Sequence, residues 1–220
     1  MCLFKWLERH PQETGGALVV PRRPRVLFFH GQKNDSQVAN HLLKAQGWLQ
    51  PYLDFVIPDG PHSIDADTDP VQLQRVGLTQ LVAENKYTPG GKYTEWCANF
   101  DVFLDIRLHP EEERSEEVRY AAALDYLEQM AKAHGPFDAV DGFCQGAAFA
   151  QVALCQQRQG RDLGLGHVRM MIPMAPWQCP YHESIGLFQE QLQIPLLVLQ
   201  GSKDHSADAL SMSKLYYIIQ

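Results

Sequence analysis

The chain has 220 residues, of which 45% are apolar and 20% are charged. A chain of this length buries about 70% of the surface that it exposes when unfolded, so it can form one domain without a disulfide scaffold. Nineteen Lys plus Arg against 26 Asp plus Glu give a net charge of −7 at pH 7. Because nucleic-acid-binding proteins carry basic stripes, this balance argues against a nucleic acid as the partner.

The apolar runs are too short for a membrane span, which needs about 20 residues. Charged residues interrupt the apolar residues at positions 1–10, as a secretory signal peptide would not allow, so we expect a cytoplasmic protein. An odd number of cysteines at irregular spacing predicts free thiols rather than disulfides or a zinc site. We also expect that the protein needs no cofactor. The five cysteines are Cys2, Cys97, Cys144, Cys155 and Cys179.

Short β-rich runs alternate along the chain with longer helical patterns, which is typical of βαβ units and a mainly parallel sheet. The near-continuous apolar character of these runs indicates strands that are covered on both faces. The pattern therefore predicts an α/β three-layer sandwich. It predicts strands at 25–30, 52–57, 137–143, 168–174 and 195–200. It predicts helices at 36–47, 116–134, 145–157 and 206–219.

Two segments do not follow this alternation. Residues 1–24 form an N-terminal extension to a domain at 25–220. Residues 63–110 form a long insertion between two predicted strands, so they are a candidate lid or substrate wall over one end of the sheet. Its aromatic residues, which include Tyr93, Trp96 and Phe100, are typical of a core but on a lid would suit an apolar acyl chain.

The segment with the clearest chemical signal is Gly142-Phe-Cys-Gln-Gly-Ala-Ala148, between a predicted strand and a predicted helix. A strand that turns directly into a helix crowds the turn residue, and small residues two positions away on either side relieve this crowding. Cys144 would then lie at a helix N-terminus, where the dipole favours an anion. The backbone N–H groups of Gln145 and of Gln32, which follows the first strand, are the expected oxyanion donors. Asp204 follows the last strand, in the order nucleophile and then acid that α/β-hydrolases use.

Five motifs in this order resemble the FSH-type serine hydrolases, small cytosolic α/β-hydrolases that act as esterases or thioesterases. The resemblance covers about residues 25–217 and implies that Cys144 stands at the position of the serine nucleophile, Asp204 at that of the triad acid, and Gln32 and Gln145 at those of the oxyanion donors. The motifs are Val26-Leu-Phe-Phe-His-Gly31, Phe55-Val-Ile-Pro-Asp-Gly-Pro-His62, Gly135-Pro-Phe-Asp138, Gly142-Phe-Cys-Gln-Gly-Ala-Ala148 and Gly201-Ser-Lys-Asp204.

The chain departs from the family pattern at the triad. Cysteine replaces serine at position 144, and no histidine follows His205, whereas in the family the triad His lies beyond one further strand. We therefore expect a sheet that lacks the usual final strand and helix. A thiol with an ordinary pKa of about 8.5 is a few per cent thiolate at pH 7, so acylation can proceed without a base. The water that must attack the acyl intermediate is not activated by the thiol and has no base to deprotonate it, so slow deacylation is predicted.

Three further residues lie near the predicted site, and two of them, Asp141 and His62, carry two interpretations each. Asp141 either disfavours the thiolate through its charge or is hydrogen-bonded within the turns at the strand end. His62 either fixes a loop or serves as a surrogate base, and the first role is the more common for a histidine at a strand end. His30 is expected to fix the loop beside the oxyanion site.

These observations predict a hydrolase of a small-molecule carboxylic ester or thioester that works through a covalent acyl intermediate on Cys144. Two alternatives stay open at this point. One is a catalytically inactive, hydrolase-like protein that binds a ligand or a partner, and the other is a fragment that has lost the C-terminal histidine. A sheet without its last strand exposes an unpaired edge, and we expect either a second copy of the chain, in a homodimer, or the extension at residues 1–24 to cover it.

Overall fold

The computed structural model describes residues 22–47, 51–66, 68–75, 78–96, 110–175 and 194–199, and all structural statements below refer to these residues. Most of the predicted N-terminal extension, the predicted helix at 206–219 and the predicted triad acid Asp204 lie outside them. Within the described residues, no helix combines the length and the apolar character that crossing a membrane requires.

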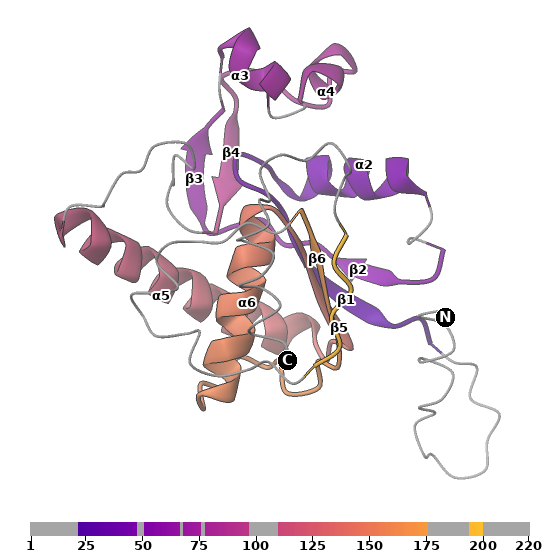
Figure 1. Cartoon of the computed structure of the whole chain (residues 1–220), viewed down its shortest axis with the longest axis vertical. Helices are drawn as coiled ribbons and strands as arrows, with labels where there is room; N and C mark the ends of the chain where they lie inside the picture. Colours follow the sequence, from indigo (N-terminus) through magenta and orange to yellow (C-terminus); the bar gives the residue numbers. More distant parts are fainter. Residues whose placement is uncertain are drawn as a thin grey trace.

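A parallel four-stranded sheet with the order β2-β1-β5-β6 forms the centre of the molecule (Figure 1). Each predicted strand from 25 to 174 is present, and the α/β fold prediction is confirmed. The predicted strand at 195–200 is represented by two parallel bridges, from Leu196 to Met171 and from Leu199 to Met174, which continue the sheet beyond β6. The strands are β1 (Arg25–Phe29), β2 (Asp54–Val56), β5 (Ala139–Phe143) and β6 (Met171–Met174).

Helices cover both faces of this sheet because alternate strand residues are apolar on both sides. Val26 and Phe28 pack in the cluster that contains residues of α2, whereas Leu27 and Phe29 pack in the cluster that contains residues of α5 and α6. The result is the predicted three-layer sandwich (Figure 1). The helices are α2 (Ser36–Gln46), α5 (Pro110–His134) and α6 (Gln145–Arg158).

Two of these helices show how local sequence sets their ends. Asp35 caps α2 by accepting a hydrogen bond from the Val38 N–H at 2.8 Å, and Gly47 ends the helix with a left-handed φ of 66°. Helix α5 starts at Pro110, six residues before the predicted start at 116. Proline lacks the N–H that a first helical turn leaves unsatisfied, so it is well suited to this position.

The insertion forms a small unit at the carboxyl end of β1. Its strands β3 and β4 pair antiparallel. A β-bridge between Asn34 and Thr94 joins β4 to the segment between β1 and α2. Trp96 is fully buried, with ring centroids 4.8 Å from Phe29 and 5.1 Å from Phe149, so this aromatic residue belongs to the core. The elements are β3 (His62–Asp65), α3 (Pro70–Arg75), α4 (Thr79–Ala83) and β4 (Lys92–Glu95).

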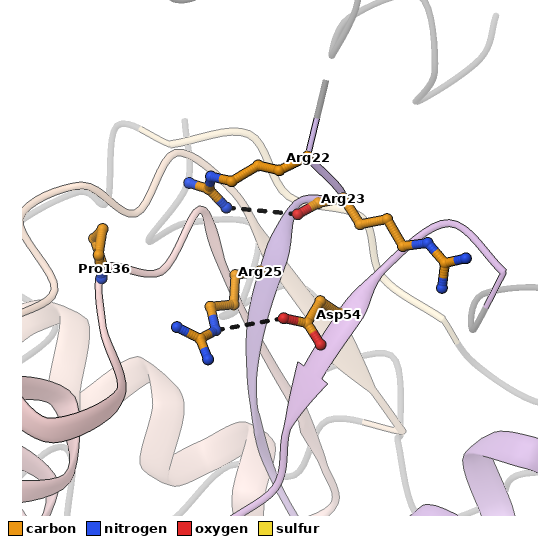
Figure 2. Close-up of a pocket in the computed structure, with 5 residues that line it drawn as sticks. All are labelled: Arg22, Arg23, Arg25, Asp54 and Pro136. Atoms are coloured by element: carbon orange, nitrogen blue, oxygen red, sulfur yellow. Dashed lines mark hydrogen bonds and ion pairs between the residues drawn. The ribbon is translucent and has the colours of Figure 1, made fainter. Parts of the chain in front are cut away.

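A hollow of about 430 Å³ lies at the amino ends of β1 and β2, and Figure 2 shows the arginines that line it. Arg25 forms an ion pair with Asp54 at 3.4 Å, and Arg22 forms one at 2.7 Å with Asp138, which also accepts a hydrogen bond from the Arg25 N–H at 2.7 Å. Asp138 thus ties the starts of β1 and β5 together. Cys144 follows the carboxyl end of β5, so this hollow lies at the opposite end of the sheet from Cys144. Parallel α/β sheets bind ligands at their carboxyl ends.

Candidate active site

Cys144 lies at the sharp turn between β5 and α6, as the sequence predicts. Its φ of 52° and ψ of −115° place a non-glycine residue in a strained conformation, which costs about 1–3 kcal/mol. The surrounding hydrogen bonds hold this conformation: the Cys144 N–H donates to the Met174 carbonyl at 3.0 Å, and the Cys144 carbonyl accepts from the Ala147 N–H at 3.0 Å. The residue is half-buried. Backbone strain of this kind is typical of a nucleophile elbow.

The two glycines that flank Cys144 are required by close backbone contacts. A Cβ on Gly146 would lie 2.1 Å from the Phe29 carbonyl oxygen and 2.4 Å from that of His30, and one on Gly142 would lie 2.6 Å from the Ala147 nitrogen. The first turn of α6 therefore packs directly against the end of β1. The predicted crowding of the turn is confirmed.

Replacing Gly146 by alanine is expected to destabilise the fold by about 2 kcal/mol, because a backbone carbonyl rather than a flexible side chain must move. Urea unfolding of the variant and the wild type measures the difference. Gly166 is the matched control, since a Cβ there would meet nothing within 4 Å. Equal stability of Gly146→Ala and Gly166→Ala would contradict the contact.

Gln32 and Gln145, the predicted oxyanion donors, lie on two segments that meet at the elbow. Gln145 is the first residue of α6, and Gln32 lies in the turn after β1. A Cβ on Gly31 would come within 2.9 Å of the Phe143 ring, so this turn lies against the residue that precedes Cys144.

Their side chains converge on Glu95, a residue that the sequence analysis did not select. Gln32 Nε2 donates to Glu95 Oε2 at 3.3 Å, and the Gln145 side chain is a further hydrogen-bond partner of this carboxylate. Arg119 of α5 forms an ion pair with Glu95 Oε1, and the Glu95 side chain is 2% exposed. Burial raises the pKa of Glu95, while Arg119 and the two glutamines offset part of that rise. The sequence signal that could have identified Glu95 is its spacing from Tyr93. Residues two apart in a strand face the same side, and Tyr93 is buried.

His30 fixes the loop at this edge, as expected. Its Nδ1 donates to the Gly31 carbonyl at 2.8 Å, and its Nε2 accepts from the Gly60 N–H at 3.0 Å. The residue is fully buried, and burial lowers the pKa of its imidazole. His30 is therefore neutral and occupied at both ring nitrogens.

Replacing His30 by alanine is expected to cost about 2 kcal/mol, because the Gly60 N–H loses an acceptor and a buried ring is removed. The variant should also be less acid-sensitive. A lowered pKa means that the folded protein binds fewer protons than the unfolded one, so wild-type stability falls as the pH drops below about 6.5. Urea unfolding at pH 7 and pH 5 measures both effects, with the exposed His134→Ala as control.

His62 and Asp141 also have definite surroundings. His62 Nε2 donates to the Arg119 carbonyl at 3.0 Å, and burial, together with the Arg119 charge, lowers the pKa of the ring. Asp141 is fully buried on β5, and neither carboxyl oxygen makes a hydrogen bond of normal geometry to the described residues. Burial raises its pKa well above the ordinary value, and the Gly142 amide offsets this only in part. The raised pKa disfavours the ionised form that the first interpretation of Asp141 requires, and the Gly142 amide is the strand-end contact that the second interpretation names.

The thiol and metal predictions can be checked for the described residues alone. Cys155 is 6% exposed and packs in the core, as expected of a packing residue. In the described ranges, no three His, Cys, Asp or Glu side chains come together in a way that could hold a metal ion. Cys97, Cys179 and Asp204 lie outside these ranges.

Comparison with known proteins agrees with this geometry. The chain is 31% identical to esterase FUS5 of Gibberella moniliformis over 139 residues. This matched stretch covers 62% of this chain and 51% of FUS5. The chain is also 26% identical over 129 residues to an uncharacterized hydrolase of Schizosaccharomyces pombe. This second matched stretch covers 58% of this chain and 27% of that protein. The chain thus spans about half or less of the length of these curated relatives.

Two solved structures share the fold at low sequence identity. Esterase PE8 has a TM-score of 0.51 and 18% identity over 89% of this chain and 77% of its own. A carboxylesterase of Mesorhizobium loti has a TM-score of 0.50 and 16% identity over 90% of this chain and 76% of its own. The serine hydrolase (FSH1) family model matches residues 20–220. The chain with the Cys144 elbow therefore belongs to the FSH1 family of serine hydrolases and has an α/β-hydrolase fold.

Proposed function

We propose that this protein hydrolyses a small carboxylic ester or thioester through an acyl intermediate on Cys144. The observation that carries the proposal is the strained turn at Cys144, held between β5 and the first turn of α6 by glycines that admit no side chain. Strain at a position that the fold over-determines is typical of functional residues. Family membership and the relative named esterase FUS5 support the ester class.

In the first half-reaction the Cys144 thiolate attacks the carbonyl carbon of the substrate and forms a C–S bond. The carbonyl oxygen becomes an oxyanion, which the backbone N–H groups of Gln32 and Gln145 stabilise. The oxyanion then collapses, the bond to the alcohol or thiol leaving group breaks, and the leaving group takes a proton from solvent. The acyl group stays on Cys144 as a thioester.

In the second half-reaction water attacks this thioester and releases the acid, and deacylation is expected to be the slow step. Asp204 is the proposed acid of the triad, but an acid alone does not deprotonate water. The two histidines described at this edge support slow deacylation, because the ring nitrogens of His30 and Nε2 of His62 are engaged in hydrogen bonds to other groups. The same observation favours the second candidate function, a hydrolase-like protein that binds a ligand without turnover.

Intact-mass spectrometry after addition of p-nitrophenyl acetate distinguishes these functions. The proposal predicts a stoichiometric release of p-nitrophenol and a lasting mass increase of one acetyl group on Cys144. Multiple turnover without an adduct would show that a base acts in deacylation. Absence of both adduct and turnover would overturn the proposed enzyme and leave the binding protein.

We also propose that the protein is a cytoplasmic homodimer. In the described part of the chain, β2 is the terminal strand on one side of the sheet, and an unpaired strand edge is a surface on which a second copy can add. Light scattering on the purified protein tests the assembly. A monomer at all concentrations would contradict it.

A further inference from the structure

Glu95 stands at the junction of the segments that form the proposed site. It is the last residue of β4, and its carboxylate contacts Gln32 in the turn after β1, Gln145 at the start of α6 and Arg119 in α5. Gln32 and Gln145 are also the residues whose backbone N–H groups we assign to the oxyanion. One buried carboxylate therefore links both donor segments.

The hydrogen bonds around Glu95 leave little freedom to Gln145. Gln145 Oε1 accepts from the Trp96 N–H at 3.1 Å, and its amide nitrogen is the group that can donate to the carboxylate. Both ends of this side chain are thus fixed to consecutive residues, Glu95 at the end of β4 and Trp96 directly after it. Because Trp96 is fully buried, the start of α6 is held against the core.

The backbone of Glu95 is also held in place. A Cβ on Gly60 would lie 2.4 Å from the Glu95 carbonyl oxygen, so the two backbones are in close contact. The Gly60 N–H in turn donates to His30 Nε2 at 3.0 Å and to Thr94 Oγ1 at 3.0 Å. A rigid support of this kind lets a side chain position its neighbours precisely.

The ion pair between Glu95 and Arg119 offsets the negative charge of the buried carboxylate. A negative charge close to the place where an oxyanion develops would oppose the reaction, and a buried carboxylate is costly unless it is paired. Arg119, whose side chain is 31% exposed, supplies the compensating charge from α5. The pair can therefore hold both glutamines while adding little net charge to the site.

We propose that Glu95, neutralised by Arg119, is a positioning residue that sets the distance between the Gln32 and Gln145 backbone donors. This role rests on the proposed function, because it concerns the oxyanion of the acylation step. Glu95 itself does not contact the substrate in this scheme.

The test compares two reactions of the same thiol. Acylation of Cys144 by p-nitrophenyl acetate passes through an oxyanion, whereas alkylation by iodoacetamide replaces iodide directly and forms none. Peptide mass spectrometry gives both rate constants at Cys144 separately from the other cysteines. A group that positions oxyanion donors affects the first rate constant and leaves the second unchanged.

Two variants change the link in different degrees. In Glu95→Gln the carboxamide offers one acceptor oxygen where the carboxylate offered two, and its NH₂ group faces a donor, so at least one contact is lost. Misplacement of catalytic groups by about 1 Å costs up to about a hundredfold, and we expect acylation by Glu95→Gln to be about 10 to 100 times slower. Gln32→Ala keeps the backbone N–H and removes one contact to Glu95, so a decrease of about threefold is expected.

The control variant is Asp125→Asn, which breaks the exposed ion pair to Arg161 and should leave both reactions unchanged. The proposal is overturned if Glu95→Gln and Gln32→Ala acylate like the wild type, or if acylation and alkylation slow together, since that would mean lost folding or access. If circular dichroism shows that Glu95→Gln is unfolded, Gln32→Ala decides. A wild-type protein that is alkylated but never acylated would instead overturn the proposed function, and the positioning role with it.

Discussion

Replacing Cys144 by serine is expected to slow acylation by p-nitrophenyl acetate by at least about a thousandfold, close to the background of Cys144→Ala. A thiol is partly ionised at neutral pH without help, whereas a hydroxyl needs a base. In a serine hydrolase, loss of the base alone costs about a millionfold in turnover. Release of p-nitrophenol under excess substrate, followed for the wild type and both variants, measures this difference.

The serine variant is informative because the family nucleophile is serine. An active Cys144→Ser protein with multiple turnover would contradict slow deacylation and show that a base acts from the part of the chain that the structure does not describe. Circular dichroism and unfolding in urea should show all three proteins folded alike, because serine and alanine are small enough for the turn at residue 144. A loss of structure in the variants would make the rates uninformative, and the control therefore precedes the kinetics.

Replacing Asp141 by leucine is expected to stabilise the folded protein by about 3 kcal/mol at pH 7. Asp141 is fully buried on β5, and its carboxyl oxygens have no hydrogen bond of normal geometry to the described residues. An unsatisfied buried polar group costs about 1–3 kcal/mol, and leucine adds apolar burial in a side chain of the same shape. For a domain of this size, such a gain corresponds to an increase in Tm of about 6–12 °C.

The pH dependence gives an independent check on Asp141. Because burial raises its pKa in the folded state, the folded protein binds more protons at this group than the unfolded chain. The contribution of Asp141 is therefore most favourable below about pH 4 and is lost progressively as the pH rises toward the folded-state pKa. Asp141→Asn should remove this dependence while keeping a polar group.

Urea unfolding from pH 4 to pH 8 for the wild type, Asp141→Leu and Asp141→Asn separates the two effects. The stability difference between Asp141→Leu and the wild type should widen with rising pH. The matched control is Asp125→Asn, at an exposed aspartate. A destabilised Asp141→Leu protein would show that the carboxyl group has a favourable partner and would contradict this description of the strand.

The sequence was sufficient for the elbow because the information is local. The Gly142-Phe-Cys-Gln-Gly146 spacing follows from backbone crowding at a strand-to-helix turn, and the structure places Cys144 there with φ of 52°. The strands at 25–30 and 137–143 were equally visible, since a run covered on both faces is apolar throughout. Element ends were less accessible: α5 starts at Pro110, because the acidic residues after it do not carry the apolar period that marks the rest of the helix.

Tertiary structure alone decided which polar side chains meet. Glu95 and Arg119 are separated by 24 residues, Glu95 and Gln32 by 63, and nothing in the local pattern of either partner points to the other. The state of Asp141 was undecided for the same reason, since burial depends on the helices that pack over the sheet. The sequence determined the fold and the sharp turn at Cys144 because both follow from periodicity and backbone geometry. The electrostatics around this turn depends on contacts that exist only once the chain has folded.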